Sequence, residues 1–338
     1  MRVLLTRLSA LGDIVHTWPL AAALARALPG VEVAWVVEEP FLPLVAGHPA
    51  VALAVPVATR RWRRHPLART TCDGIRTVRR TLRAFGAELA LDPQGLMKSA
   101  LWGAVAGARD RVGLARPHRR ELPARVFYTR TVVPPPAARH VVDVNLSMLA
   151  AVGSGAPPGA APDGRFLLAG RRAAPAAVSA TVALLPGTGG HGKAWAAAGY
   201  AELARRLGDA GVETVVAWGP GERQLAERIA ASGGGRSRPA PPTSIPELAA
   251  LLADASVVVG GDTGPLHLAA SLGVATVAIF IATDPSRNGP RGPAVTIVSG
   301  AGGEARGGSA RSVPASPVSV DAVFAAVRAQ LGIAAREQ

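Results

Sequence analysis

The stretch RVLLTRLSALGDIVHTWPLAAALARALPGVEVAWVV (residues 2–37) contains two short apolar runs separated by a longer segment with helical spacing. The runs RVLLTRL and VEVAWVV have the length and composition of buried strands, and the segment DIVHTWPLAAALARAL is typical of a helix. A strand, a helix and a second strand in this order form one βαβ unit of a parallel sheet. We therefore predict an α/β fold.

The same alternation continues beyond this unit and occurs twice along the chain. It is interrupted by the Pro/Gly-rich segment 153–164 and restarts with the strand-like run TVALLPG at 181–187. We predict two doubly wound, Rossmann-like domains facing across a cleft, an N-terminal domain over 1–165 and a C-terminal domain over 178–315. The helical pattern within 316–338 is a candidate for packing back on the N-terminal domain.

Length and composition favour an intracellular globular protein. The chain has 338 residues, of which 49% are hydrophobic, and this is enough for two separate cores. A single cysteine, Cys72, excludes an internal disulfide and fits a reducing compartment. The uncharged stretch 265–282 approaches the length of a membrane span, but Gly273 divides it. We expect a short helix and a buried strand there, and a soluble, cytoplasmic protein.

The positive charge is concentrated in the first half of the chain. The formal net charge is +14, and residues 1–150 hold 21 Lys and Arg against 10 Asp and Glu, a balance of +11. The densest runs are TRRWRRH (59–65) and RPHRR (116–120). They are either solvated arginine-rich loops or a surface for an anionic partner such as nucleic acid, acidic lipid or a phosphorylated sugar. One aromatic residue is too few for a base-stacking platform, which argues against nucleic acid.

In open parallel sheets, ligands bind beyond the carboxyl ends of the strands, so the residues that follow each strand are the informative ones. Asp13 comes shortly after the first strand. It is either a helix cap, because a carboxylate accepts hydrogen bonds from free helix amides, or a reactive carboxylate at the edge of the sheet.

The segment GTGGHGKA (187–194) follows a strand and contains most of a Walker A phosphate loop. Ala194 stands where that motif requires a Ser or Thr to bind magnesium, which argues against a P-loop NTPase. The remaining interpretation is a phosphate site made from backbone amides and Lys193.

Two further strand ends carry polar residues suited to a nucleotide. GGDTGPLHLAASLG (260–273) opens a helix whose N-terminus is free to face an anion, with His267 one turn into it. WGPGE (218–222) places Glu222 where a carboxylate can accept from both ribose hydroxyls. The alternative roles are helix capping by Asp262 or Thr263, a packed His267, and a Glu222 favoured by the helix dipole.

Taken together, these motifs resemble those of the type I ADP-heptose:lipopolysaccharide heptosyltransferases, which are inverting glycosyltransferases of family 9 with the GT-B fold. The resemblance covers nearly the whole chain and is carried by GDIVHTWP, WVVEEPF, RRWRRH, DPQGLMKSAL, GKAW, WGPGE, DTGPLHL and TDP. It implies transfer of the first heptose from ADP-heptose to the Kdo of Kdo-lipid A.

The resemblance also implies a role for each matching residue. Asp13 would be the general base, and Lys193 would assist catalysis by holding the departing diphosphate. The donor would be bound by Thr188, Lys193, Glu222, Asp262, Thr263, Gly264 and His267. The anionic acceptor would be bound by Arg60, Arg61, Arg63, Arg64 and Arg120.

The cofactors and partners expected on this basis are few. No D-x-D motif occurs, so we expect no metal, with ADP-heptose as the donor substrate. The partners would be Kdo-lipid A and, through it, the inner face of the cytoplasmic membrane as a peripheral contact, with no nucleic acid. Gly189 and Thr243 depart from the family pattern and leave open a related family 9 transferase with another core acceptor or nucleoside-diphosphate sugar.

Overall fold

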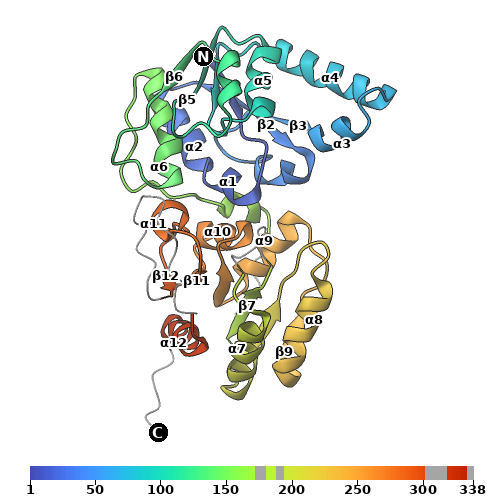
Figure 1. Cartoon of the computed structure of the whole chain (residues 1–338), viewed down its shortest axis with the longest axis vertical. Helices are drawn as coiled ribbons and strands as arrows, with labels where there is room; N and C mark the ends of the chain where they lie inside the picture. The colour runs from blue at the N-terminus through green and yellow to red at the C-terminus, as the bar shows by residue number, and fades with distance from the viewer. Residues whose placement is uncertain (172–179, 188–193, 301–317, 333–338) are drawn as a thin grey trace. The chain divides into compact units, whose positions relative to one another are not determined.

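The computed structural model describes residues 1–171, 180–187, 194–300 and 318–332. The chain divides into two compact units, unit 1 (Met1–Pro162) and unit 2 (Asp163–Gln338) (Figure 1). The division falls inside the Pro/Gly-rich segment 153–164. Each unit contains one six-stranded parallel sheet with helices around it.

The sheet of unit 1 has the strand order β3-β2-β1-β4-β5-β6. Its strands are β1 (Arg2–Thr6), β2 (Glu32–Glu38), β3 (Leu53–Val57), β4 (Leu89–Asp92), β5 (Asp110–Leu114) and β6 (Arg130–Val132). The helices are α1 (Leu11–Val15), α2 (Trp18–Ala27), α3 (Thr59–Arg64), α4 (Arg69–Phe85), α5 (Met97–Ala106) and α6 (Val141–Leu146). Short 3₁₀ helices span η1 (Glu39–Leu44), η2 (Leu122–Phe127) and η3 (Ser147–Val152).

The sheet of unit 2 has the strand order β12-β11-β10-β7-β8-β9. Its strands are β7 (Thr181–Leu185), β8 (Glu213–Val216), β9 (Ser237–Pro239), β10 (Val257–Gly261), β11 (Ala275–Phe280) and β12 (Val295–Ser299). The helices are α7 (Ala197–Asp209), α8 (Arg223–Ser232), α9 (Ile245–Ala253), α10 (Gly264–Ser271), α11 (Pro285–Asn288) and α12 (Val320–Gln330). Short 3₁₀ helices span η4 (Arg165–Leu168) and η5 (Gly234–Arg236).

The two sheets share one topology, because β7 to β12 repeat the neighbour order of β1 to β6. This is the doubly wound order of Rossmann folds, and it confirms the predicted fold class. In such sheets the chain reverses its winding direction between the first and fourth strands. We call these positions the unit 1 switch point, between β1 and β4, and the unit 2 switch point, between β7 and β10.

The inner strands form because their apolar residues are buried on both faces of each sheet, as is typical of parallel sheets. Every residue of β10 is buried, and so is all of β1 except Arg2. The stretch 265–282 forms most of α10 and all of β11, with Gly273 between them at φ +84°, as predicted. Within the described residues, no helix is both long and apolar enough to cross a lipid bilayer.

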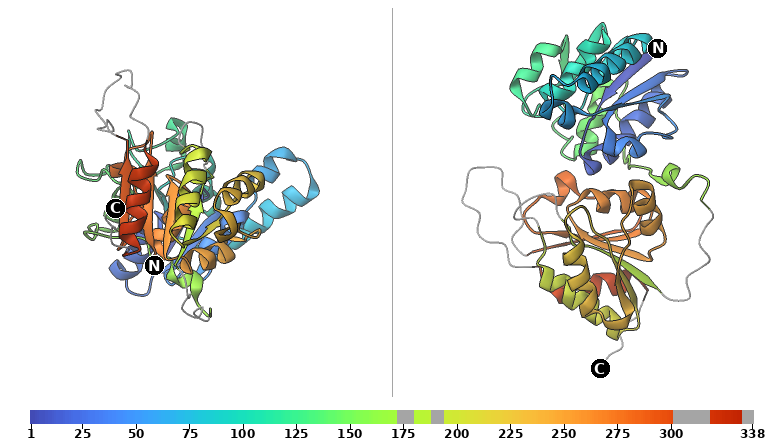
Figure 2. Two further views of the ribbon diagram at one scale, coloured as in Figure 1. Left: turned by 90° about the horizontal axis from the view of Figure 1, so that it is seen from below. Right: turned by 90° about the vertical axis from the view of Figure 1, so that its right-hand side faces the viewer.

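The helix α12 packs in unit 2 (Figure 2). Its buried Val323 and Val327 belong to the same core as Leu203 of α7 and Ile279 of β11. Just before α12, the carbonyl of Val318 accepts a hydrogen bond from Trp195 Nε1 at 2.9 Å. The expectation that this helix packs back on the N-terminal domain is therefore replaced by packing on the C-terminal one, where apolar residues of α7 and β11 receive its buried face.

Candidate active site

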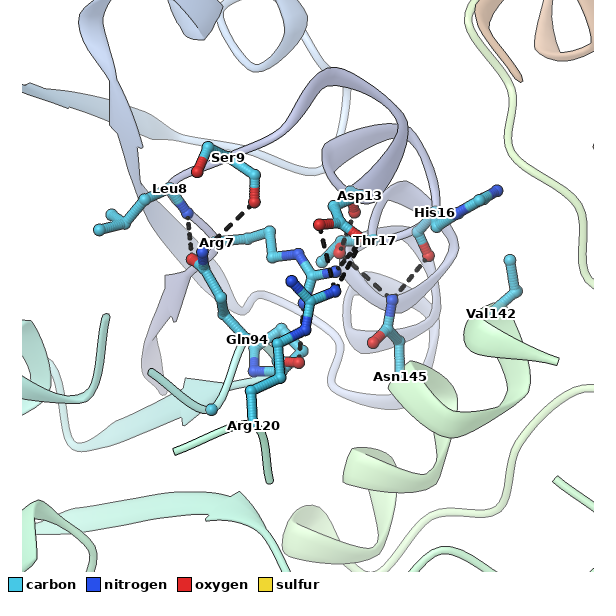
Figure 3. Close-up of polar contacts among 12 residues, drawn as sticks. Arg7, Leu8, Ser9, Asp13, His16, Thr17, Gln94, Arg120, Val142 and Asn145 are labelled. Carbon is cyan, nitrogen blue, oxygen red and sulfur yellow. Dashed lines mark hydrogen bonds and ion pairs between the residues drawn. The ribbon is translucent and has the colours of Figure 1, made fainter. Parts of the chain in front are cut away.

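Asp13 lies at the unit 1 switch point between two guanidinium groups (Figure 3). Arg7 Nη2 is 2.7 Å from Asp13 Oδ1, and Arg120 Nη2 is 3.2 Å from both carboxylate oxygens. Arg7 belongs to the loop after β1, whereas Arg120 comes from the segment between β5 and η2. The topology therefore joins residues that are 107 positions apart in the sequence.

These contacts keep the Asp13 carboxylate ionised. Burial by itself would raise the pKa of Asp13, but the charges of Arg7 and Arg120 outweigh burial and hold the pKa below its ordinary value. A hydrogen bond from the Ala10 amide acts in the same direction. The site thus holds an ionised carboxylate whose side chain is 23% exposed.

The capping interpretation of Asp13 is only partly right. The N-cap position of α1 is occupied by Ala10, and Asp13 lies in the first turn, three residues further on. Its carboxylate accepts from the Ala10 amide in the manner of the third residue of a capping box. The dipole of α1 is small because the helix has only five residues, so the two arginines stabilise the carboxylate more than the helix does.

The loop after β4 fixes the loop after β1. The Leu8 amide donates to Gln94 Oε1 at 2.8 Å, and Gln94 Nε2 donates to the carbonyl of Ser9 at 3.3 Å. Arg7 Nη1 donates to the carbonyl of Pro93 at 2.8 Å. One turn of backbone therefore positions Arg7 and the residues that lead into α1.

The loop after β4 is itself held by Asp92, which is fully buried. Its Oδ1 accepts from the amides of Gln94 and Gly95, and its Oδ2 accepts from Ser99 Oγ at 2.9 Å and Tyr128 Oη at 2.6 Å. Burial raises the pKa of Asp92, although all four hydrogen bonds favour its ionised form. Asp92 thus acts as a structural acceptor beneath the site.

Gly95 lets the Arg120 segment approach this loop. Its φ is +69°, which favours glycine, and a Cβ there would lie 3.1 Å from the Arg120 amide nitrogen. The Glu121 amide donates to the Gly95 carbonyl at 2.9 Å, and Glu121 Oε2 accepts from the Met97 amide at 2.6 Å. This close backbone contact places the Arg120 side chain beside Asp13.

The end of α1 is anchored from a third element. Asn145 of α6 donates through Nδ2 to the carbonyl of His16 at 3.0 Å and to Thr17 Oγ1 at 3.3 Å. Thr17 Oγ1 in turn donates to the carbonyl of Asp13 at 2.8 Å (Figure 3). The backbone of Asp13 is therefore fixed from α6 while its side chain is fixed by arginines.

The predicted acceptor arginines of RRWRRH form one turn of exposed charge. Arg60, Arg61, Arg63 and Arg64 are all exposed on α3, and Arg61 Nη2 is 3.1 Å from Glu39 Oε1. The intervening Trp62 is buried in the core of unit 1, where its ring lies 6.1 Å from that of Trp102. The aromatic residue thus anchors the helix in the core and leaves the four arginine side chains at the surface.

In unit 2, four predicted donor residues meet at the N-terminus of α10. Asp262 Oδ1 lies 3.4 Å from His267 Nε2, and both side chains are largely buried. Thr263 is the N-cap residue of α10, and its buried Oγ1 has no hydrogen-bond partner among the residues that the structure describes. Gly264 begins the helix, so its amide is one of those that lack an intrahelical acceptor.

Glu222 lies across the unit 2 switch point from this helix start. Its Oε2 accepts from the Gly219 amide at 2.8 Å, and a Cβ on Gly187 would come within 2.2 Å of the same oxygen. Gly187 therefore provides the space in which the Glu222 carboxylate rests at the end of β7. Thr188 and Lys193 lie outside the described residues.

The structure adds three residues to which the sequence analysis gave no role, namely Arg7, Asp92 and Gln94. Asp92 ends β4 and Gln94 follows two residues later, which is the available signal, but nothing in the sequence indicates that Arg7 is buried against Asp13. Among the described residues, no three His, Cys, Asp or Glu side chains are grouped so that they could hold a metal ion.

Sequence comparisons with known proteins agree on one family. A family model described as glycosyltransferase family 9 (heptosyltransferase) matches residues 75–309. The chain is 38% identical over 295 residues to lipopolysaccharide heptosyltransferase 1 of Pseudomonas aeruginosa, an alignment that covers 86% of this chain and 82% of that protein.

Solved structures give the same result. The fold is similar to that of the Escherichia coli heptosyltransferase WaaC with ADP, with a TM-score of 0.83, 28% identity, and coverage of 98% of this chain and 100% of that one. It is also similar to WaaC with ADP-2-deoxy-2-fluoro heptose, with a TM-score of 0.79, 28% identity, and coverage of 97% and 99%.

Proposed function

The chain belongs to glycosyltransferase family 9, the heptosyltransferases, and from this premise we propose that it transfers heptose from ADP-heptose to the Kdo of Kdo-lipid A. The relatives named lipopolysaccharide heptosyltransferase 1 and the WaaC complexes with ADP and a fluorinated ADP-heptose support this donor and acceptor. Family membership leaves no support for the P-loop NTPase and nucleic-acid-binding alternatives. The proposed product is the first heptosylated form of the lipopolysaccharide inner core.

The observation that carries the mechanism is the ionised Asp13 carboxylate at the unit 1 switch point. We assign it the role of general base in a single displacement. The acceptor hydroxyl oxygen forms a bond to the anomeric carbon, its proton passes to Asp13, and the bond from that carbon to the diphosphate breaks. The electron pair leaves with ADP, and the configuration at the anomeric carbon inverts.

We assign the donor to unit 2. The amides at the start of α10 and the Thr263 hydroxyl are suited to the diphosphate, since a helix N-terminus stabilises negative charge. Glu222 is suited to the ribose hydroxyls, and Asp262 with His267 to the sugar and phosphate. Thr188 and Lys193 complete the proposed donor site on the basis of their sequence motif.

We assign the acceptor to the arginines of unit 1. Arg60, Arg61, Arg63 and Arg64 present exposed guanidiniums, whose planar geometry suits carboxylates and phosphates, and Arg120 brings one to the base itself. These arginines could therefore bind both the carboxylates and the phosphates of the acceptor.

We further propose that transfer requires no divalent metal, because Lys193 and the α10 amides provide the positive field that the leaving diphosphate needs. Activity should persist in excess EDTA. Loss of activity that is restored by magnesium or manganese would contradict this part of the proposal.

A lipid-linked acceptor implies that the enzyme works at the inner face of the cytoplasmic membrane. The helices α3 and α4 support a peripheral contact, since Arg69, Arg76, Arg79 and Arg80 of α4 continue the exposed charge of α3. Leu67, in the connection between the two helices, is 94% exposed. Each basic residue near an anionic bilayer contributes about 1 kcal/mol of attraction.

A vesicle assay tests this contact. The protein should bind vesicles of anionic phospholipid and not neutral ones, and replacing Arg69, Arg76 and Arg80 with Gln should weaken that binding. The matched control removes the same charge from unit 2 by replacing the exposed Arg223, Arg228 and Arg236 with Gln. Equal loss of binding in both variants would show that net charge, and not this surface, is responsible.

The activity itself is tested by incubating the protein with ADP-heptose and Kdo-lipid A. The expected result is release of ADP together with a product heavier by one heptose in the mass spectrum, and far less product from the Asp13→Asn variant over the same time. Absence of both products from the wild-type protein, with another nucleoside-diphosphate sugar accepted instead, would reassign the donor within the family.

A further inference from the structure

The two guanidiniums on Asp13 differ sharply in their freedom to move. The side chain of Arg7 is 1% exposed, whereas that of Arg120 is 49% exposed. Arg7 contacts Oδ1 at 2.7 Å, and Arg120 contacts Oδ1 and Oδ2 at 3.2 Å each. Oδ1 is therefore contacted by both arginines, whereas Oδ2 is contacted by Arg120 and not by Arg7.

Arg7 is fixed from both its ends. Its Nη1 donates to the Pro93 carbonyl at 2.8 Å, and its own backbone carbonyl accepts from Trp35 Nε1 at 3.1 Å. The next residue is tied to Gln94 through the Leu8 amide. The buried Arg7 guanidinium would lose its charge partner and its hydrogen bond to the Pro93 carbonyl if it moved, so we expect it to stay in place when substrates bind.

Arg120 has no such restraint on its side chain. Its backbone lies against Gly95, but its guanidinium is half-exposed and its contacts with Asp13 are longer than that of Arg7. An incoming carboxylate or phosphate can therefore exchange with Asp13 for Arg120 at little cost, because exposed ion pairs contribute little net stability.

Resting on the proposed function, we infer that Arg7 is the positioning residue of the general base and Arg120 its exchangeable cover. Arg7 keeps Asp13 ionised and holds Oδ1, so that Oδ2 is the oxygen that receives the acceptor proton. Arg120 covers Oδ2 in the free enzyme and moves to an anionic group of the acceptor when the acceptor binds. Binding of the acceptor thereby uncovers the base that takes the proton from the attacking hydroxyl.

The direction of the charge effects is consistent with this order of events. Both arginines lower the pKa of Asp13, so departure of Arg120 makes Asp13 a stronger base at the moment when the hydroxyl arrives. Arg7 remains and prevents burial from protonating the carboxylate. Asp92, at the end of β4, is a further charged group that acts on Arg7, and it favours the charged form of the guanidinium.

The test compares Arg7→Met with Arg7→Lys in the full-length protein. With Arg7 removed and Arg120 left as the neighbouring cation, burial is opposed less strongly, so the pKa of Asp13 should rise and the acidic limb of kcat/KM in Arg7→Met should move to higher pH. Near neutral pH, kcat should fall about 10- to 100-fold, which is part of what a general base contributes, and should recover as the pH rises. Arg7→Lys should keep the acidic limb near that of the wild type.

Two controls separate this role from a general structural one. Arg116→Met removes an exposed guanidinium from the same segment as Arg120 and should leave the pH profile unchanged. Arg120→Met should raise the acceptor KM much more than it lowers kcat. A folded Arg7→Met variant with the kcat and acidic limb of the wild type would overturn the inference.

A substrate-free measurement distinguishes failure of this inference from failure of the proposed function. The carboxyl carbon of Asp13, labelled with ¹³C and assigned by its absence in Asp13→Asn, should titrate at higher pH in Arg7→Met than in the wild type. An unchanged titration would overturn the role of Arg7 even if transfer is confirmed. A raised titration midpoint would support it even if the wild-type protein transferred another sugar.

Discussion

The switch points of the two units have the same topology and opposite contents. At β1/β4 the space is filled by the charges of the protein itself, with Asp13 held between Arg7 and Arg120 above the buried Asp92. At β7/β10 the structure places glycine, free helix amides and the Thr263 hydroxyl, which has no partner among the described residues. Among the described residues, one switch point holds an ion-paired carboxylate, and the other holds the amides at the start of α10 and an unpartnered hydroxyl.

Under the proposed roles, the two units use one fold for two tasks, catalysis and binding, and differ in the residues that follow their strands. Preorganised ion pairs suit a catalytic side chain such as the Asp13 carboxylate, which must keep its charge and its orientation. Backbone amides without an intrahelical acceptor suit an anionic ligand such as the donor diphosphate. Changes at the unit 1 switch point should therefore alter kcat, whereas changes at the unit 2 switch point should alter donor affinity.

The largest effect is expected for Asp13→Asn. The amide keeps the shape of the side chain and an oxygen for Arg7 but removes the basic carboxylate, so kcat should fall about 10²- to 10⁴-fold. The affinity for ADP-heptose, measured by calorimetry, should remain close to that of the wild type. A variant that transfers sugar at the original rate but melts at lower temperature would reduce Asp13 to a helix-start residue.

Thr263→Val should have the next largest effect, and it should change the donor affinity and not kcat. Valine keeps the shape and removes the buried hydroxyl, so a lost hydrogen bond to a charged diphosphate should weaken donor binding by about tenfold or more. kcat at saturating donor and the melting temperature should change little. If stability falls while the donor KM is unchanged, the hydroxyl serves a partner within the chain and not the donor.

The double substitution Arg60→Ala with Arg61→Ala should raise the acceptor KM several-fold and leave donor affinity unchanged. Both side chains are exposed, so their attraction for the acceptor is screened over about 8–10 Å by salt. Adding salt to the wild type should therefore imitate the double variant. An altered donor affinity with a constant acceptor KM would reverse the assignment of substrates to units.

The smallest effect concerns stability and pH. The pKa of Asp13 lies below its unfolded value of 3.8, so its ion pairs stabilise the folded state fully above that value and are lost as the pH falls through the folded pKa. The wild type should melt above Asp13→Asn at neutral pH, by about 2–4 °C for each kcal/mol of difference. Scanning calorimetry should show this gap closing below pH 4, and a gap that widens there would contradict the direction of the shift.

The fold and half of the site could be predicted because they depend on local patterns. Alternating strands and helices specify parallel sheets, and the ends of parallel strands gather on one edge, which brings out Asp13, Asp262 and Glu222 as candidates. If the run RRWRRH forms a helix, its single apolar residue, Trp62, is the one expected to face the core.

The remainder depends on packing between distant segments. Arg7 looks like any charged residue next to a strand, and its burial follows from the Pro93 carbonyl and Asp13, which meet only when β1 and β4 pair. The contact of Arg120 with Asp13 requires the backbone of its segment to lie on Gly95. The location of α12 was missed for a similar reason, because an apolar helix face does not indicate which core receives it.

The buried Arg7 also sets the chemistry of compounds that could block this site. An amine designed to pair with Asp13 would have to displace Arg120 and then rest beside a guanidinium that cannot retreat, so part of its attraction to the carboxylate would be cancelled by repulsion. A neutral hydroxyl or amide donor meets no such opposition at Oδ2. Inhibitors of this enzyme should therefore carry an uncharged donor toward Asp13 and an anion toward Arg120.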